Sequence, residues 1–192
     1  MAFPPRPELP ALLASLTRAL EARGLPFMLI GGQAVLVHGT PRLTEDVDVT
    51  LAADPSRLPD VLTACADAGL TPLPEDPAAF VRDTFVLPAR HAASGLRADF
   101  VFSTTAYERE AIARSIRIVV EGVAVPVATA EDLLLHKLFA GRPRDIEDAE
   151  SVVRRSGPSM DWDYVERWAR TFAEVPGREE MPAAVERLRR FS

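Results

Sequence analysis

The fold of this chain is decided by the stretch Phe27-Met28-Leu29-Ile30-Gly31-Gly32 and, after a short apolar segment, by Pro41-Arg42-Leu43-Thr44-Glu45-Asp46-Val47-Asp48-Val49-Thr50-Leu51. An apolar strand runs into two glycines, and a second strand then carries two aspartates that flank a valine. Because strand side chains alternate, Asp46 and Asp48 point to the same side, about 7 Å apart. Two such carboxylates repel each other unless a cation lies between them, and hard oxygen ligands suit Mg²⁺.

The glycines and a third acid extend this pattern. Gly31 and Gly32 let a backbone turn approach an anion such as phosphate. Phosphate binding beside metal-binding carboxylates is typical of phosphoryl or nucleotidyl transfer. Asp99 is the best candidate for a third oxygen ligand, because a carboxylate in an apolar strand is costly without a partner. The alternative is that Asp99 pairs with Arg97 on the same strand face, or lies at an exposed edge.

A single lysine is the second informative feature. Lys137 is the only lysine among 22 basic residues, which makes it a candidate for a role that needs a compact ammonium, such as contacting a triphosphate. Leucines flank it at helical spacing, so its stem is expected on apolar surface with the ammonium at an edge. The alternative is an ordinary surface lysine. Asp145 and Asp148 follow at the start of another predicted helix, where the helix dipole alone explains them.

Two residues lie on the approach to the paired aspartates. Arg42 could meet a phosphate or a nucleotide base, or it could be a solvated loop cation. Thr44 is better explained as a residue whose hydroxyl caps a turn than as a residue that binds a ligand.

The length and composition of the chain exclude several classes of protein. The 192 residues fit one domain, or a domain with a helical extension. The net charge of −6 provides no general basic field for nucleic acid, so an RNA substrate would need a local arginine patch. The single cysteine, Cys65, excludes an internal disulfide and a cysteine-rich zinc site, and favours a reduced, cytoplasmic setting. No apolar run reaches the roughly 20 residues of a membrane span.

Periodicity and turn residues predict a mixed α and β region followed by helices. The predicted strands are 26–31, 45–52, 80–87, 96–102, 116–120 and 123–127, the last two forming a hairpin that turns at Glu121-Gly122. The predicted helices are 8–23, 32–38, 55–68, 105–114, 129–141, 143–156, 161–174 and 179–190.

These residues resemble the nucleotidyltransferase superfamily that includes DNA polymerase β and the minimal antibiotic nucleotidyltransferases. The shared pattern is Gly31-Gly32, a short helix, Asp46-Val47-Asp48, and a single aspartate, Asp99, on a later strand. The segment from Val127 through Lys137 to Asp148 looks like the AbiEii-type toxin nucleotidyltransferases and the related MenT toxins. The resemblance covers roughly residues 25–155, and Gly32 departs from it, since many of those toxins have serine there.

The resemblance implies an α+β nucleotidyltransferase fold: a mixed β-sheet flanked by helices, with a helical C-terminal region. It places the catalytic core at residues 1–128 and a helical region that contributes Lys137 at 129–192. The implied roles divide among three groups of residues. Asp46, Asp48 and Asp99 would bind two Mg²⁺ ions, with Asp99 helping to deprotonate the attacking hydroxyl. Gly31, Gly32, Arg42, Thr44 and Lys137 would bind the NTP. Asp145 or Asp148 would position the lysine or the nucleotide.

The expected activity is Mg²⁺-dependent transfer of NMP from an NTP to an acceptor. The expected setting is a toxin of a toxin–antitoxin pair that modifies tRNA or another RNA and has a cognate antitoxin protein as partner. The alternatives are transfer to a small molecule such as an antibiotic, transfer to a protein hydroxyl, and a non-catalytic module of the same fold that binds a nucleotide or a partner.

Overall fold

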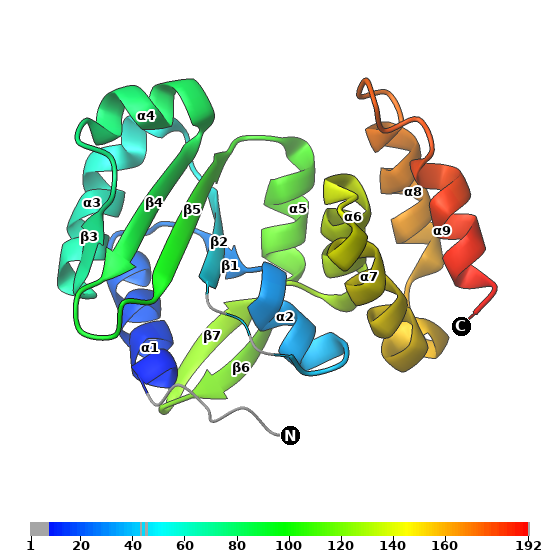
Figure 1. The fold of residues 1–192 in the computed structure, drawn as a ribbon, viewed down its shortest axis with the longest axis horizontal. Helices are drawn as coiled ribbons and strands as arrows, with labels where there is room; N and C mark the ends of the chain where they lie inside the picture. Colours follow the sequence, from blue (N-terminus) through cyan, green and yellow to red (C-terminus); the bar gives the residue numbers. More distant parts are fainter. Residues whose placement is uncertain (1–7, 43, 45, 192) are drawn as a thin grey trace. The chain divides into compact units, whose positions relative to one another are not determined.

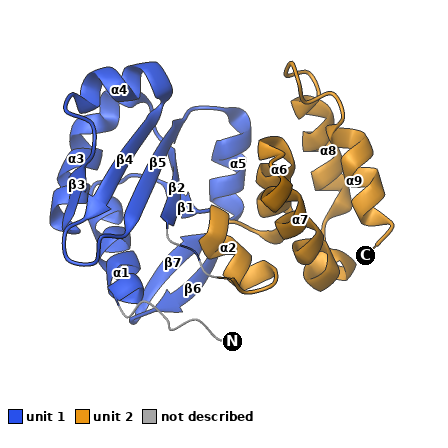
Figure 2. Cartoon of the chain, in the orientation of Figure 1, with its two compact units in different colours: residues 1–30, 43–127 blue, residues 31–42, 128–192 orange. Residues whose placement is uncertain are grey.

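The computed structural model describes residues 8–42, 44 and 46–191. The chain divides into two compact units (Figure 2). Unit 1 is formed by Met1–Ile30 and Leu43–Val127, and unit 2 by Gly31–Arg42 and Ala128–Ser192. None of the helices in the described part of the chain is both long and apolar enough to cross a membrane.

Unit 1 is built on a seven-stranded mixed sheet (Figure 1). The strands lie in the order β3-β4-β5-β2-β1-β7-β6, with β2 parallel to β5, β1 parallel to β7, and the other neighbours antiparallel. Their bounds are β1 Phe27–Leu29, β2 Asp46–Ala52, β3 Leu70–Pro72, β4 Val86–His91, β5 Arg97–Ser103, β6 Ile116–Val120 and β7 Val123–Val127.

The described part of unit 1 contains four α-helices. They are α1 Glu8–Glu21, α3 Leu58–Asp67, α4 Pro77–Thr84 and α5 Ala106–Arg114, with a 3₁₀ turn at Pro55–Arg57 before α3. Helices α1 and α3 pack on each other, α1 also contacts β6 and β7, α4 packs on β4, and α5 packs on β2. The sheet is thus flanked by helices, as the sequence predicted.

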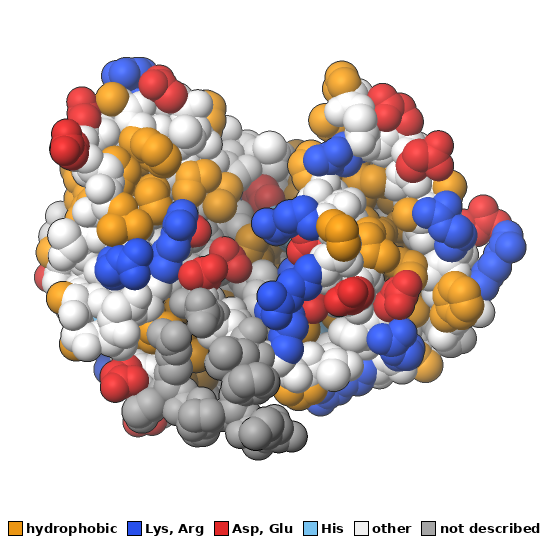
Figure 3. Space-filling model, in the orientation of Figure 1, with side chains coloured by type: hydrophobic (Ala, Val, Ile, Leu, Met, Phe, Trp, Pro, Cys, Tyr) orange, Lys and Arg blue, Asp and Glu red, His pale blue; other side chains and the backbone are white. Residues whose placement is uncertain are grey.

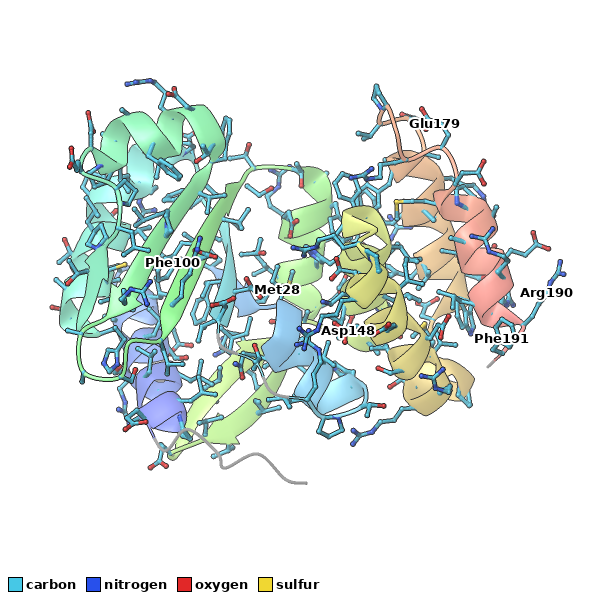
Figure 4. The ribbon with its side chains drawn as sticks, viewed as in Figure 1. Met28, Phe100, Asp148, Glu179, Arg190 and Phe191 are labelled. Carbon is cyan, nitrogen blue, oxygen red and sulfur yellow. The ribbon has the colours of Figure 1, made fainter. Side chains whose placement is uncertain are left out.

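Alternation along β5 gives the sheet two chemically different faces. Ala98, Phe100 and Phe102 are buried in the core, and Figure 4 marks Phe100 on this strand. The intervening residues Arg97 and Asp99 lie on the opposite face and keep part of their surface exposed. A one-residue slip would exchange these two sets, so the buried phenylalanines fix the register that places Asp99.

All regular secondary structure in the described part of unit 2 is helical. It contains α2 Gly31–His38, α6 Ala130–Ala140, α7 Pro143–Ser156, α8 Trp162–Phe172 and α9 Met181–Arg189, with a 3₁₀ turn at Gly157–Ser159. Helix α2 packs against α6 and α7, and α8 packs against α6 and α9. At Gly39, just after α2, a Cβ atom would stand 2.5 Å from Ser151 Oγ of α7. Only glycine therefore allows this approach without a shift.

Most predicted elements are confirmed, and one is wrong. The hairpin turns at Glu121-Gly122, and Thr105 and Thr129 cap α5 and α6 with their hydroxyls. The predicted strand at 80–87 is instead the second half of α4 and the first residues of β4. Asp76 caps α4 by accepting from Ala79 N at 3.0 Å. The predicted start of the strand 45–52 falls on Glu45, outside the described residues.

Candidate functional site

The parallel register of β2 and β5 brings the three predicted aspartates of unit 1 onto one sheet face. Asp48 is the direct partner of Asp99, and Asp46 is the partner of Arg97. Directly paired residues of neighbouring strands point to the same side, and Asp46 lies two residues from Asp48. Asp46 is exposed and Asp48 is partly exposed, so the three carboxylates lie together on a solvent-accessible part of the sheet.

Arg97 lies beside these carboxylates and is bound to Asp99. Its Nε donates to Asp99 Oδ1 at 2.9 Å, and the Asp99 side chain is 23% exposed. The hydrogen bond and charge of Asp99, followed by the charges of Asp46 and Asp48, raise the pKa of Arg97 above its ordinary value. The sequence offered Asp99 as a third metal ligand, as a partner of Arg97 or as a residue at an exposed edge. The structure shows the pairing with Arg97, and the role of metal ligand stays a prediction.

The donor set fits a divalent cation in its chemistry. Three carboxylates supply hard oxygen ligands on two adjacent strands. As the side chains stand, no group of three His, Cys, Asp or Glu residues among those described is close enough to hold one ion. Arg97 binds Asp99 instead, so a cation at these carboxylates would have to compete with Arg97.

Gly31 and Thr44 shape the backbone next to the aspartate strand. Gly31 has φ +59°, a left-handed conformation that favours glycine, and it is the first residue of α2 directly after the β1 segment. Ile30 N donates to Asp48 O at 3.0 Å, which ties the end of the β1 segment to the aspartate strand. Thr44 donates its hydroxyl to Asp46 O at 3.1 Å. This is the turn contact that the sequence favoured for Thr44.

Lys137 lies in unit 2, at the centre of a buried charge cluster. Its Nζ is 2.8 Å from Asp145 Oδ1 and 2.8 Å from Asp148 Oδ2, and its side chain is only 8% exposed. The ammonium therefore joins α6 to the first turns of α7. A direct contact with a triphosphate stays a prediction.

Two arginines complete the cluster around the aspartates of α7. Arg42 binds Asp148 with two parallel hydrogen bonds of 2.9 and 2.8 Å, and Arg142 Nε donates to Asp145 at 2.6 Å. Figure 4 marks Asp148 on α7. Burial acts to raise the pKa of both carboxyls, but the hydrogen bonds and charges of the lysine and arginines lower it below its usual value. Both aspartates are thus charged at neutral pH.

The sequence suggested that Asp145 or Asp148 would position Lys137, but it did not pair Arg42 or Arg142 with these aspartates. The helix-dipole explanation of Asp145 and Asp148 is incomplete, because both are buried and bound to specific cations. The pairing of Arg42 with Asp148 joins residues 106 positions apart, which no local pattern can reveal. The role of Arg142 was missed, although its spacing of three residues from Asp145 in a helix start was a usable signal.

The family is established by a match over most of the chain. Residues 9–183 match the family described as "Nucleotidyltransferase of unknown function (DUF6036)". The chain belongs to this nucleotidyltransferase family. It is an enzyme of the nucleotidyl-transfer class. The sequence-based prediction of the superfamily is confirmed, and its finer placement among the AbiEii-type toxins stays a prediction.

Solved structures share the fold of this nucleotidyltransferase. The antibiotic-resistance factor ANT(2'')-Ia is 16% identical, with a TM-score of 0.58 over 95% of this chain and 97% of its own. An antigenic nucleotidyltransferase-like protein from Paracoccidioides brasiliensis is 16% identical, with a TM-score of 0.55 over 93% and 92%. The lincosamide antibiotic adenylyltransferase LnuA is 15% identical, with a TM-score of 0.50 over 74% and 94%. No curated protein sequence matches the chain.

Proposed function

We propose that this nucleotidyltransferase moves NMP from an NTP to an acceptor hydroxyl at the carboxylates of β2 and β5. The observation that supports the proposal is the pairing of Asp48 with Asp99 across two parallel strands, with Asp46 on the same face. Asp46, Asp48 and Asp99 would hold divalent cations, with Mg²⁺ as the expected metal. When bound, the metal supplies positive charge to the entering and leaving oxygens of the displacement.

The chain's own residues have distinct proposed tasks in this step. The acceptor oxygen would form a bond to the α-phosphorus as the bond to the bridging oxygen of the β-phosphate breaks, which releases pyrophosphate. Asp99 would accept the hydroxyl proton once Arg97 releases it. The backbone N–H groups of Gly31 and Gly32 at the start of α2 would donate to phosphate oxygens. Arg42 and Thr44 stay proposed nucleotide contacts.

Lys137 and its aspartates fit a positioning role in this proposal. The ammonium is bound by Asp145 and Asp148, and Asp148 in turn holds the guanidinium of Arg42. The cluster would thus hold Arg42 in place to contact an anionic substrate such as the NTP.

Two classes of acceptor are candidates, and each implies a different biological role. The first is an RNA, including tRNA, modified by a toxin that has an antitoxin partner, which follows from the resemblance of residues 127–148 to toxin nucleotidyltransferases. The second is a small molecule, in keeping with fold neighbours described as ANT(2'')-Ia with adenylyl-2''-tobramycin and as LnuA with lincomycin. ANT(2'')-Ia is 17% identical in that complex, so this likeness concerns the fold.

The proposal is tested by labelling. Purified protein is incubated with each α-³²P-labelled NTP, Mg²⁺ and total cellular RNA, and the products are separated on a gel. Label on a discrete RNA that is lost in Asp46→Ala establishes RNA as the acceptor and identifies the donor base. Label on a small molecule or a protein, lost in the same variant, establishes the other setting. Transfer that survives in Asp46→Ala and Asp48→Ala contradicts the assignment of the site.

A further inference from the structure

The sheet of unit 1 ends in two edge strands that differ in their protection. Strand β3 is three residues long and ends in Pro72, which has no N–H to offer a further strand. Short strands and prolines are common protection for a sheet edge. Strand β6, at the other edge, has the five-residue sequence Ile-Arg-Ile-Val-Val, in which all residues except the arginine are β-branched. Figure 1 shows β6 as the outermost strand beside β7. The sheet thus has one protected edge and one unprotected edge.

The β6–β7 hairpin determines which backbone groups of β6 face this open edge. Its two-residue turn makes Val120 and the opposite residue of β7 a hydrogen-bonded pair, and every second residue back along β6 repeats this pairing. The intervening residues, Arg117 and Val119, therefore direct their N–H and C=O groups away from β7. The partner of Arg117 is Pro126, which has no N–H and so agrees with this alternation. Among the described residues, none forms a backbone hydrogen bond with these outward groups.

The side chains of β6 leave the open edge accessible. Val119 is 78% exposed and Ile116 is 36% exposed. Arg117 is turned back over the hairpin, because its Nη1 donates to Ala124 O of β7 at 2.9 Å and lies 2.6 Å from a carboxylate oxygen of Glu21 in α1. On the face of unit 1 seen in Figure 3, arginines and acids gather over α4, β4 and β5 instead. The edge is therefore an apolar strand whose single charge is already paired.

We infer that β6 is a docking strand for a second copy of this chain, whose own β6 pairs with it antiparallel across a two-fold axis at Ile118. In this register Arg117 lies opposite the partner's Val119, and Val119 lies opposite the partner's Arg117. Each of these two pairs exchanges two backbone hydrogen bonds, so every outward N–H and C=O group of both strands is bound. A two-fold contact between identical surfaces is the commonest arrangement of homodimers.

The side-chain pairs of this register favour a second copy as the occupant. Ile118 faces the partner's Ile118, and Ile116 faces the partner's Val120, so β-branched side chains meet along one face of the strand pair. Arg117 faces a valine and stays bound to Glu21 of its own chain, so no like charges lie directly opposite each other. Both strands begin at residue 116 and end at residue 120, so neither extends beyond the other. The edge is thus complementary to itself in hydrogen bonding, charge and length.

This inference is independent of the proposed function. Strands β6 and β7 contain no carboxylate residue, and the aspartates of the proposed transfer site lie on β2 and β5. Stabilisation of the protein by NTP with Mg²⁺, measured by thermal unfolding, reports on the transfer site alone. A loss of that stabilisation in a protein that still dimerises contradicts the proposed function and leaves the docking strand unaffected.

Single-cysteine variants test the register, because the native Cys65 is buried. Ile118→Cys places two thiols in a directly opposed, non-hydrogen-bonded pair with Cα atoms about 4.5 Å apart, within disulfide range. Val119→Cys places them diagonally, with Cα atoms about 7–8 Å apart, beyond that range. We expect a disulfide-linked dimer of Ile118→Cys on a non-reducing gel after mild oxidation, and little from Val119→Cys. Random collisions would favour the more exposed Val119→Cys, so that opposite order overturns the inference.

Sedimentation of the reduced full chain over a concentration series gives a second measurement. Val119→Pro removes an outward N–H and puts a ring in its place, which an edge strand tolerates. It is expected to weaken dimerisation about tenfold or more. Val119→Lys keeps the backbone and places a cation opposite the partner's Arg117, so it should weaken dimerisation as well. Val119→Glu places the opposite charge there and should dimerise more tightly than Val119→Lys.

Two control variants complete the comparison. Val119→Thr keeps the N–H and the branched shape, and Phe191→Lys removes a comparably exposed apolar side chain, 74% exposed, from unit 2. Both should dimerise as wild type does. A wild-type protein that stays monomeric at every concentration overturns the inference. Equal dimerisation of wild type, Val119→Pro and Val119→Lys overturns it too, since the copies would then associate through another surface.

Discussion

Single residues decide whether the buried charges of unit 2 stabilise or destabilise it. Lys137 Nζ serves two carboxylates at once, each 2.8 Å away. Taking charges out of water costs several kcal/mol per ion, and this cost is offset only while every charge keeps its partners. The sequence marked Lys137 as unusual because it is the only lysine. Its buried position could not be predicted, because it depends on how α6 and α7 pack.

Lys137→Met is expected to lower the free energy of unfolding by about 3–5 kcal/mol, since it leaves two buried carboxylates without their shared cation. The measurement is urea unfolding of the protein without nucleotide. Lys137→Arg keeps the charge and serves as the control, with a smaller loss. A Lys137→Met protein as stable as wild type would show that the ammonium has no structural role and would favour the direct triphosphate contact.

At the scale of helices and strands, the elements that could be predicted from the sequence are those with local turn or capping residues. The helix starts near residues 105 and 129 and the Glu121-Gly122 turn could be predicted because each feature depends on residues within four positions of one another. Strand β5 could be predicted because buried and more exposed residues alternate along it with a period of two. Helix α4 was missed because Phe80 to Leu87 is apolar enough for a strand, whereas Asp76 and Pro77, which begin the helix, lie before that run.

The β6–β7 hairpin offers a test of this local reasoning. Glu121 and Gly122 have φ values of +49° and +72°, and two-residue hairpin turns with both φ values positive favour Asn-Gly. Glu121→Asn is therefore expected to raise the free energy of unfolding by roughly 0.5–1 kcal/mol, measured by urea unfolding. Glu121→Ala is the control without that preference. A Glu121→Asn protein less stable than Glu121→Ala would contradict the turn assignment.

At the scale of the whole molecule, the sequence indicated the fold class but not which segments associate. Residues 31–42 belong with the C-terminal helices, held by contacts such as Arg42 with Asp148 and His38 Nε2 with Ala128 O at 2.8 Å. The three carboxylates could be proposed as neighbours from the sequence. Their direct register, and the position of Arg97 among them, required the order of strands in the sheet.

Stability of the whole molecule is expected to depend on pH through His136. Burial, with a contribution from the Lys137 charge, lowers the pKa of His136 to about 4. An unfolded histidine has a pKa of about 6.5, so between about pH 6.5 and 4 the unfolded chain binds a proton that the folded chain does not. The free energy of unfolding should fall as pH falls through this window, and His136→Leu should flatten that part of the profile.

A second loss of stability is expected at lower pH. The pKa values of Asp145 and Asp148 are lowered in the folded protein, so their contribution is complete above the unfolded value of about 3.9 and is lost as pH falls through the folded values. Urea unfolding across a pH series measures both losses. A profile of His136→Leu that still follows wild type between pH 6.5 and 4 would contradict the assignment to His136.

The central claim is that Asp46, Asp48 and Asp99 bind a divalent cation together with an NTP. The most direct measurement is a titration with Mn²⁺ followed by electron paramagnetic resonance, with and without each NTP. Wild type and the control Asp163→Asn, which removes an exposed acid of α8, should bind Mn²⁺ more tightly when the donor NTP is present. Asp48→Asn should lose this binding while remaining folded. Equal Mn²⁺ binding by Asp48→Asn and wild type would contradict the account.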